Sequence, residues 1–215
     1  MIKISPSILS VDILKLEEEV RSLDMNGADY IHIDIMDGHY VPNITFGPNI
    51  VKSLRKVTSK ILDVHLMIKP VKQYINEFVK AGSDIISFHP EADEHPEEII
   101  KMISDAEIKA GIAIHPEINI TDIDHLFNKV QQIIVMTVKP GFGGQKFMHD
   151  QVKKIKDLDE IRKNNNYNYE IAVDGGVNNE NAKICKDNGA DVLAVGSYLL
   201  SQNQNNYNEI INSLR

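Results

Sequence analysis

The sequence predicts a closed (β/α)₈ barrel, because two kinds of segment alternate along the whole chain. Short runs rich in β-branched residues recur between longer amphipathic stretches, which is typical of a parallel sheet whose strands are each followed by a helix. The runs are, in order, "IKISPSIL", "DYIHIDI", "ILDVHLM", "DIISFH", "GIAIH", "QIIVMTV", "YEIAV" and "VLAVGS". Eight such units favour a closed barrel over the alternative, an open doubly wound sheet.

Amphipathic stretches between these runs supply the predicted helices. They include residues 12–27, 71–82, 96–111 and 179–190, and several end in glycine, where a helix C-cap is expected. Asparagine-rich patches, "KNNNYNY" and "SQNQNNYN", fall between or after these elements and are typical of solvated loops. No break in composition divides the chain, so we expect a single barrel domain over residues 1–215.

The composition excludes several classes of partner. A chain of 215 residues with 42% hydrophobic residues can bury a sizeable core, and its net charge of -8 leaves no basic stripe for nucleic acid or an anionic membrane. The start, "MIKISPSILSVD", lacks the pattern of a signal peptide, and no later apolar run is long enough to span a bilayer. We therefore expect a cytoplasmic enzyme. Cys185 is the only cysteine, so we expect a buried, reduced thiol and no internal disulfide.

The second predicted strand carries polar residues on one face. In "IHIDIMDGHYVPN", residues 31–43, His32, Asp34 and Met36 share one face, because residues two apart point the same way. The isoleucines between them form the packed face. Burying an ionised carboxylate without a partner costs several kcal/mol, and a bound metal would supply that partner. An inward His-x-Asp pair therefore favours a metal.

Other histidines and an aspartate end further strands, where barrel enzymes carry their catalytic groups. These residues are His65 near the end of the third run, His89 and His115 at the ends of the fourth and fifth, and Asp174 directly after the seventh. An isolated strand histidine is more typical of a hydrogen-bonded core residue. Together, however, two imidazoles and two carboxylates form a four-ligand set suited to a divalent metal such as Zn²⁺, namely His32, Asp34, His65 and Asp174.

Three glycine-rich turns follow the late strands: "VKPGFGGQ", "DGGVN" and "VGSYL". A single glycine pair is typical of a tight turn. Three such turns on one rim predict a phosphate site, because glycine lets backbone N–H groups approach an anion and a helix start after Gly196 and Ser197 adds its positive end. The glycines concerned are Gly143, Gly144, Gly175, Gly176 and Gly196.

Six stretches, "SPSIL", "HIDIMDGHYVPN", "DVHLM", "VMTVKPGFGGQ", "VDGGVN" and "GADVLAVGS", form a pattern that resembles the ribulose-phosphate 3-epimerase family over essentially the whole chain. The resemblance implies a TIM barrel of the ribulose-phosphate-binding type. It also implies an isomerase that uses one divalent metal to interconvert D-ribulose 5-phosphate and D-xylulose 5-phosphate. Zn²⁺ is the expected metal, with Fe²⁺, Mn²⁺ and Co²⁺ as alternatives.

The resemblance implies roles for individual residues. The metal ligands are His32, Asp34, His65 and Asp174, and the two aspartates are also the acid and base. The substrate contacts are Ser7, His65, Gly141, Phe142, Gly143, Gly144, Asp174, Gly175, Gly176, Gly196 and Ser197. Met36, Met67 and Met136 match methionines that line the family's site, although their pattern alone predicts core packing. The expected partners are a small ketose phosphate and further copies of the chain in a homo-oligomer.

Alternatives remain at this stage. "SFHPEAD" and "HPEIN" resemble the allulose-6-phosphate 3-epimerases, which act on a six-carbon ketose, whereas "FGPNIVKSLRK" and "VDGGVN" resemble the pentulose enzymes. His115 and Lys139 depart from the family pattern, although neither falls on a chemical position. An aldolase or decarboxylase would need a Schiff-base or charge-relay lysine inside the barrel, and no predicted strand supplies one. A non-catalytic sugar-phosphate sensor would not need both Asp34 and Asp174.

Overall fold

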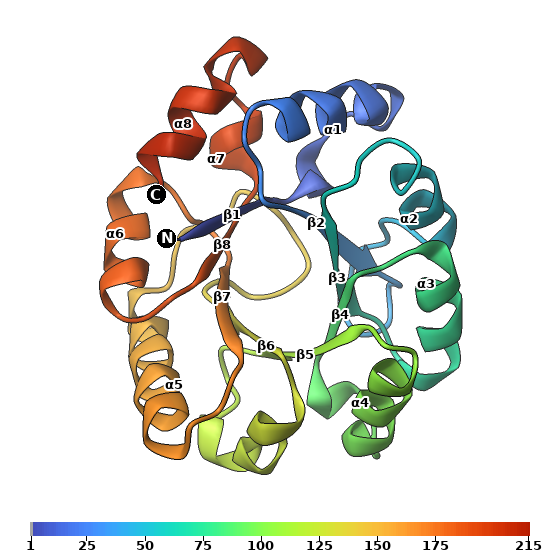
Figure 1. Cartoon of the computed structure of the whole chain (residues 1–215), viewed down its shortest axis with the longest axis vertical. Coiled ribbons are helices and arrows are strands. Elements are labelled where there is room, and N and C mark those ends of the chain that lie inside the picture. Colours follow the sequence, from blue (N-terminus) through green and yellow to red (C-terminus); the bar gives the residue numbers. More distant parts are fainter. Residues whose placement is uncertain (1) are drawn as a thin grey trace.

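The computed structural model describes residues 2–215 and places eight parallel strands in one sheet that curves around a common centre (Figure 1). The strand order is β1-β8-β7-β6-β5-β4-β3-β2, so neighbours in sequence are neighbours in space. The strands are β1 (Lys3–Pro6), β2 (Tyr30–Met36), β3 (Ile61–Met67), β4 (Ile85–Phe88), β5 (Lys109–Ile114), β6 (Gln132–Met136), β7 (Glu170–Asp174) and β8 (Val192–Val195).

The barrel closes between β1 and β2. The backbone N–H of Asp29 donates to the carbonyl of Ile4 at 2.9 Å, and the N–H of Ile4 donates to the Asp29 carboxylate at 2.8 Å. Further along, Ser7 and His32 form an isolated parallel bridge. These contacts confirm the predicted (β/α)₈ barrel and exclude the open doubly wound sheet.

Helices surround the strands on the outside (Figure 1). They are α1 (Leu16–Met25), α2 (Pro48–Leu54), α3 (Ile75–Ala81), α4 (Pro96–Asp105), α5 (Val152–Asn165), α6 (Asn179–Asp187), α7 (Ser197–Leu200) and α8 (Tyr207–Ser213). The connection from β5 to β6 contains two 3₁₀ segments, Ile120–Asp122 and Asp124–Lys129, in place of an α-helix.

Glycine was expected to mark helix C-caps, and this prediction is confirmed at Gly82 and wrong at Gly111. Gly82 is the left-handed C-cap of α3, with φ 97°. The helix expected over residues 96–111 instead ends at Asp105, because Lys109–Ile114 forms β5. Gly111 lies inside that strand, where a Cβ atom would come within 2.0 Å of the Ser87 hydroxyl. A buried hydrogen bond between Ser87 and Gln132, at 2.9 Å, fills that space.

The core has an outer and an inner part. Ile31 and Ile33 pack outward into the large cluster shared with the helices, as the alternation on this strand predicts. The inner cluster includes Tyr30, Ile134 and Met136 and fills the barrel itself. The inner face of β2 therefore carries Tyr30 in this cluster and the polar side chains of His32 and Asp34 nearer its carboxyl end.

Lys3 begins β1 at the amino end of the barrel and is the strand lysine that bears on the aldolase and decarboxylase alternatives. Its ammonium group donates to the Tyr30 hydroxyl at 2.9 Å and pairs with Glu170. Burial acts to lower the pKa of Lys3, but the hydrogen bond with Glu170 raises it above its ordinary value. Lys3 therefore stays charged, at the end of the barrel remote from the carboxyl ends of the strands, and does not supply the neutral amine that Schiff-base chemistry requires.

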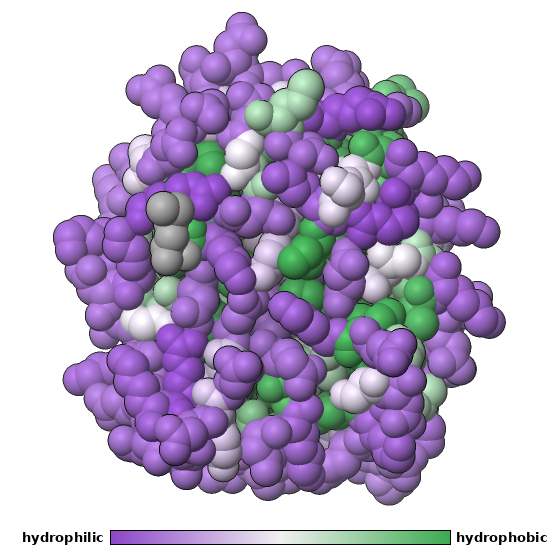
Figure 2. Space-filling model, in the orientation of Figure 1, coloured by the Kyte–Doolittle hydropathy of each residue, from purple (hydrophilic) through white to green (hydrophobic). Residues whose placement is uncertain are grey.

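Hydrophilic residues cover most of the face shown in Figure 2, with hydrophobic residues between them. Within residues 2–215, no helix has the length and apolar character needed to cross a membrane. Cys185 is fully buried and unpaired, as expected, and burial raises the pKa of its thiol to about 12.

Candidate active site

Four side chains from three strands meet at the carboxyl end of the barrel. His32 and Asp34 project from β2, His65 from β3 and Asp174 from the end of β7. One potential ligand atom from each residue lies within 4.8 Å of all the others. The pairing of β2 with β3 sets this arrangement, because Asp34 lies opposite His65 in the register. The four residues of this cluster are those predicted as metal ligands from the sequence.

One nitrogen of His32 faces the centre of this cluster without a hydrogen-bond partner. The Nε2 atom lies 3.4 Å from Asp34 Oδ1 and 3.7 Å from Asp174 Oδ2, and it is buried. The other nitrogen, Nδ1, lies 3.0 Å from Asp63 Oδ2, so Asp63 holds the ring from behind. A buried imidazole nitrogen that has no partner and points at two carboxylate oxygens suits a metal cation.

His65 faces the same centre through its Nδ1 atom. That atom lies 3.3 Å from Asp34 Oδ1 and 3.6 Å from Asp174 Oδ2. Its Nε2 atom points away from the cluster, at 3.0 Å from the Nε2 atom of His89. Two imidazole nitrogens and two carboxylate oxygens, carried by three strands, thus face one another, and this donor set fits a divalent metal.

The groups shift one another's pKa values. Burial acts to lower the pKa of His32, but the carboxylates of Asp34 and Asp63 raise it well above its ordinary value. Burial also acts to lower the pKa of His65, and hydrogen bonding to Asp174 and Asp34 raises it. Burial acts to raise the pKa values of Asp34 and Asp174, and interactions with the two imidazoles lower both. The cluster therefore attracts positive charge, either protons or a metal ion.

Hydroxyl groups fix the two aspartates. The Ser7 hydroxyl donates to Asp34 Oδ2 at 2.7 Å, so the second oxygen of this carboxylate, Oδ1, is the one that faces the imidazoles. Thr45 donates to the backbone carbonyl of Asp34 at 2.6 Å. The Thr137 hydroxyl donates to the backbone carbonyl of Gly175 at 2.6 Å and lies 3.0 Å from that of Asp174. Both strand ends are therefore held in place below the pocket.

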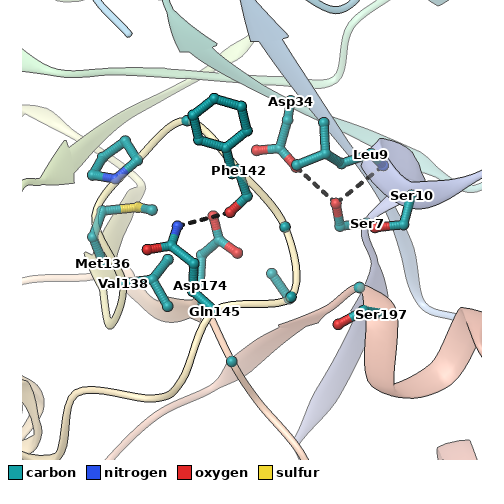
Figure 3. A pocket seen from close by; sticks show the side chains of 18 of the residues that line it. Ser7, Leu9, Ser10, Asp34, Met136, Val138, Phe142, Gln145, Asp174 and Ser197 are labelled. Atoms are coloured by element: carbon teal, nitrogen blue, oxygen red, sulfur yellow. Dashed lines mark hydrogen bonds between the residues drawn. The ribbon is translucent and has the colours of Figure 1, made fainter. Parts of the chain in front are cut away.

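A pocket opens above the cluster, and Asp34 and Asp174 point into it (Figure 3). Almost every residue that the sequence analysis assigned to substrate contact or to the site wall lines it. They are Ser7, Met36, Met67, Met136, Gly141, Phe142, Gly143, Gly144, Gly175, Gly176, Gly196 and Ser197, together with the two aspartates. His65 is the exception: it is fully buried and lies behind this lining.

Two of the glycines allow a close approach between turns. Gly175 has φ 121°, and a Cβ atom there would lie 2.8 Å from the backbone nitrogen of Val138. Gly176 has φ 65°, and its Cβ atom would lie 2.7 Å from the backbone nitrogen of Phe147. Only glycine fits at these positions, so the turn after β7 packs directly against the loop after β6.

Two side chains that shape the pocket were not singled out from the sequence, namely Gln145, which lines it, and Asn43, which holds one of its lining residues. Gln145 lines it and donates to the carbonyls of Lys139 and Phe142, at 2.7 and 2.8 Å, which ties the loop after β6 to itself (Figure 3). Asn43 donates to the carbonyl of Gly141 at 2.8 Å. Gln145 and Asn43 are the last residues of the family-like stretches "VMTVKPGFGGQ" and "HIDIMDGHYVPN", so these motifs could have identified both residues.

The two departures from the family pattern lie outside the pocket. Lys139 forms an exposed ion pair with Glu117 at 2.9 Å. His115 is half-buried, and its ring centre lies 6.5 Å from that of His89. Neither residue belongs to the four-residue cluster or lines the pocket.

Comparisons with known proteins decide the family. A sequence model of the ribulose-phosphate 3-epimerase family matches residues 3–200. The chain belongs to this family. The ribulose-phosphate 3-epimerase of Bacillus subtilis is 46% identical over 203 residues, which cover 94% of each chain. The chloroplastic ribulose-5-phosphate-3-epimerase of Arabidopsis thaliana is 43% identical over 90% of this chain and 70% of its own.

Solved structures of lower identity share the fold of this epimerase-family chain. The 3-hexulose-6-phosphate synthase of Salmonella typhimurium superposes with a TM-score of 0.75 at 16% identity, covering 99% of this chain and 96% of its own. The 3-keto-L-gulonate-6-phosphate decarboxylase of Vibrio cholerae gives a TM-score of 0.73 at 15% identity, covering 100% and 95%. These likenesses support the barrel alone. The family resemblance seen in the sequence motifs is confirmed by the family match.

Proposed function

We propose that this protein inverts carbon 3 of a ketose phosphate and so interconverts D-ribulose 5-phosphate and D-xylulose 5-phosphate. The observation that carries the proposal is the pair Asp34 and Asp174, which reach the floor of one pocket from β2 and β7. Inversion next to a carbonyl requires one group to remove a proton and another to return it on the opposite face. A sensor that only binds the sugar phosphate needs no such pair.

The residues of the floor are suited to moving this proton. One aspartate removes the proton from carbon 3, and the other, protonated, returns a proton from the other side. The Ser7 hydroxyl holds Asp34 Oδ2 at 2.7 Å, and the three methionines Met36, Met67 and Met136 form an apolar, polarizable wall beside the reacting carbons. Such a wall excludes water from the carbanion while it forms.

His32, Asp34, His65 and Asp174 would hold a divalent metal at the base of this floor. When bound, the metal would act as a Lewis acid for the negative charge that develops on the substrate oxygens. We propose Zn²⁺, because a donor set of two imidazoles and two carboxylates suits it; Fe²⁺, Mn²⁺ and Co²⁺ accept the same donors.

The glycine turns support a phosphate-bearing substrate, and the names of the relatives support a ketose of five carbons. Gly175, Gly176, Gly196 and Ser197 line the pocket with backbone groups suited to a phosphate, and the loop at 141–144 lines it from the side of β6. Both relatives described above carry the pentulose phosphate in their names, so the comparisons do not favour the allulose alternative. Further, we propose that the protein is a single-domain, cytoplasmic homo-oligomer in the pentose phosphate pathway, with no nucleic-acid or membrane partner.

The proposed function is tested with purified protein before and after treatment with a chelator. We expect conversion of D-ribulose 5-phosphate, loss of activity after metal removal, and recovery with Zn²⁺, Co²⁺, Mn²⁺ or Fe²⁺. We also expect a higher kcat/KM for D-ribulose 5-phosphate than for D-allulose 6-phosphate. Full activity of the stripped protein would contradict the metal requirement, and a preference for the hexulose phosphate would contradict the substrate.

A further inference from the structure

His65 has a partner outside the four-residue cluster. Its Nε2 atom lies 3.0 Å from His89 Nε2, and both side chains are fully buried. Two imidazole nitrogens at this distance share one proton, so one ring donates and the other accepts. His65 Nδ1 faces the oxygens of Asp34 and Asp174, which makes it the atom directed at a metal. A metal bound to Nδ1 requires the proton of His65 to lie on Nε2, and His89 is then the acceptor of the hydrogen bond.

We propose that His89 is a positioning residue, which fixes the ring orientation and the tautomer of His65. This inference rests on the proposed function, because it takes the cluster as a metal site. A histidine ligand that donates its second N–H to a fixed acceptor is held in one orientation, and loss of such an acceptor typically lowers metal affinity about 10–100-fold. No other hydrogen bond to His65 Nε2 occurs among residues 2–215.

The surroundings of His89 support this direction of the hydrogen bond. With Nε2 accepting, the proton of His89 lies on Nδ1, which faces Glu91 Oε1 at 3.5 Å. That distance exceeds a hydrogen bond, so the carboxylate acts on the N–H as a nearby negative charge. The Tyr40 hydroxyl donates to the same Glu91 oxygen at 2.9 Å, and the Tyr40 ring lies against the His89 ring with centres 4.8 Å apart. Tyr40 thus packs against the His89 ring, and the Glu91 carboxylate faces its Nδ1 atom.

The two histidine ligands differ in what supports them. His32 contacts a carboxylate directly, with Nδ1 at 3.0 Å from Asp63 Oδ2. The corresponding nitrogen of His65, Nε2, contacts the imidazole of His89 instead, and the Glu91 carboxylate lies on the far side of that imidazole's Nδ1 atom. Neither Asp63 nor His89 belongs to the four-residue cluster that would hold the metal. Asp63 therefore acts through His32, and His89 acts through His65.

Matched substitutions separate positioning from packing. His89→Phe keeps an aromatic ring against Tyr40 but removes the acceptor, whereas His89→Gln loses the ring but keeps an acceptor near the same place. His115→Phe is the control, since His115 lies outside the cluster. Affinity for Zn²⁺ and Co²⁺ is measured by competition with a chelator, and the visible spectrum of the Co²⁺ protein reports ligand geometry.

We expect His89→Phe to weaken metal binding by about 10–100-fold and to alter the Co²⁺ spectrum, as for other acceptors behind metal-bound histidines. His89→Gln should recover most of the loss, and His115→Phe should leave the affinity unchanged. A purely structural role predicts the reverse order, with Phe tolerated and Gln harmful. Metal affinity of His89→Phe equal to that of the unaltered protein would overturn the proposal.

A second measurement needs no variant and so does not depend on whether His89→Phe folds. Nitrogen-15 NMR of the zinc-loaded protein should show His65 protonated on Nε2 and His89 protonated on Nδ1 but not on Nε2. A proton on His89 Nε2 would overturn the proposal. If the unaltered protein binds metal and epimerises while His89→Phe keeps full metal affinity, the role proposed for His89 is refuted and the proposed function stands. If the unaltered protein binds no metal or does not epimerise, the proposed function fails.

Discussion

Replacing Gly176 by alanine tests whether the contact between two loops shapes the pocket. At φ 65°, a side chain costs roughly 1–2 kcal/mol in backbone strain. The added Cβ atom would also lie 2.7 Å from the backbone nitrogen of Phe147, where an ordinary contact begins at 3.4 Å. The difference, 3.4 − 2.7 = 0.7 Å, is the distance that the loop after β6 must move. Such overpacking adds roughly 1–3 kcal/mol.

Gly27→Ala supplies the matched control. Gly27 also has positive φ, at 99°, but its Cβ atom would meet nothing closer than Asn208 at 3.9 Å, and it does not line the pocket. We expect Gly27→Ala to lose about 1–2 kcal/mol of stability and to keep its kcat/KM. Gly176→Ala should lose about 2–5 kcal/mol and should also lower kcat/KM for D-ribulose 5-phosphate by about 10–100-fold, since a misplacement near 1 Å is costly.

Denaturant unfolding and steady-state kinetics measure both quantities on the same preparations. We expect both variants to lose stability through backbone strain and only Gly176→Ala to lose activity, because only Gly176 contacts the loop that lines the pocket. Equal kcat/KM values for Gly27→Ala and Gly176→Ala would refute the role given to this contact.

Three further predictions concern single groups. Asp34→Asn and Asp174→Asn should each lower kcat by about 10²–10⁴-fold with the fold retained, and near-normal turnover of either would remove it from the proton path. Because the pKa values of His32 and His65 are raised without metal, metal binding must displace protons. Affinity in competition assays should therefore fall as pH decreases, beginning above the ordinary histidine value of 6.5, and a pH-independent affinity would contradict this. Cys185 has a buried thiol with its pKa raised to about 12, so a thiol reagent at about pH 8 should label only unfolded protein, and rapid labelling of the native protein would contradict its burial.

Much of the site could be predicted from the sequence because a strand has a period of two residues. His32 and Asp34 share a face of β2, and the parallel register places Asp34 opposite His65. The same rule puts Asp63 on the face of His65, and the register pairs Asp63 with His32. The contact between Asp63 and His32 could therefore have been predicted from the sequence. The contact between His65 and His89 was not, because it depends on side-chain rotamers across neighbouring strands.

Other features lie beyond local patterns. Gly111 follows a helical stretch and resembles a C-cap in sequence, yet it serves a side-chain contact between Ser87 and Gln132 inside the barrel. Lys3 begins a strand, and only the closed barrel shows that it pairs with Glu170 far along the chain. Packing between distant segments decides such positions, and a local pattern carries no information about it.

Proton transfer at carbon 3 gives the most direct test of the central claim that Asp34 and Asp174 act from opposite faces of the substrate. D-ribulose 5-phosphate is converted in D₂O, the reaction is stopped early, and both sugars are analysed by NMR. The account predicts D-xylulose 5-phosphate with deuterium at carbon 3 and recovered substrate with almost none, because the returning proton comes from the other aspartate, which has already exchanged with solvent. Product that keeps the original hydrogen in the first turnovers would show a single shuttling base and contradict the account.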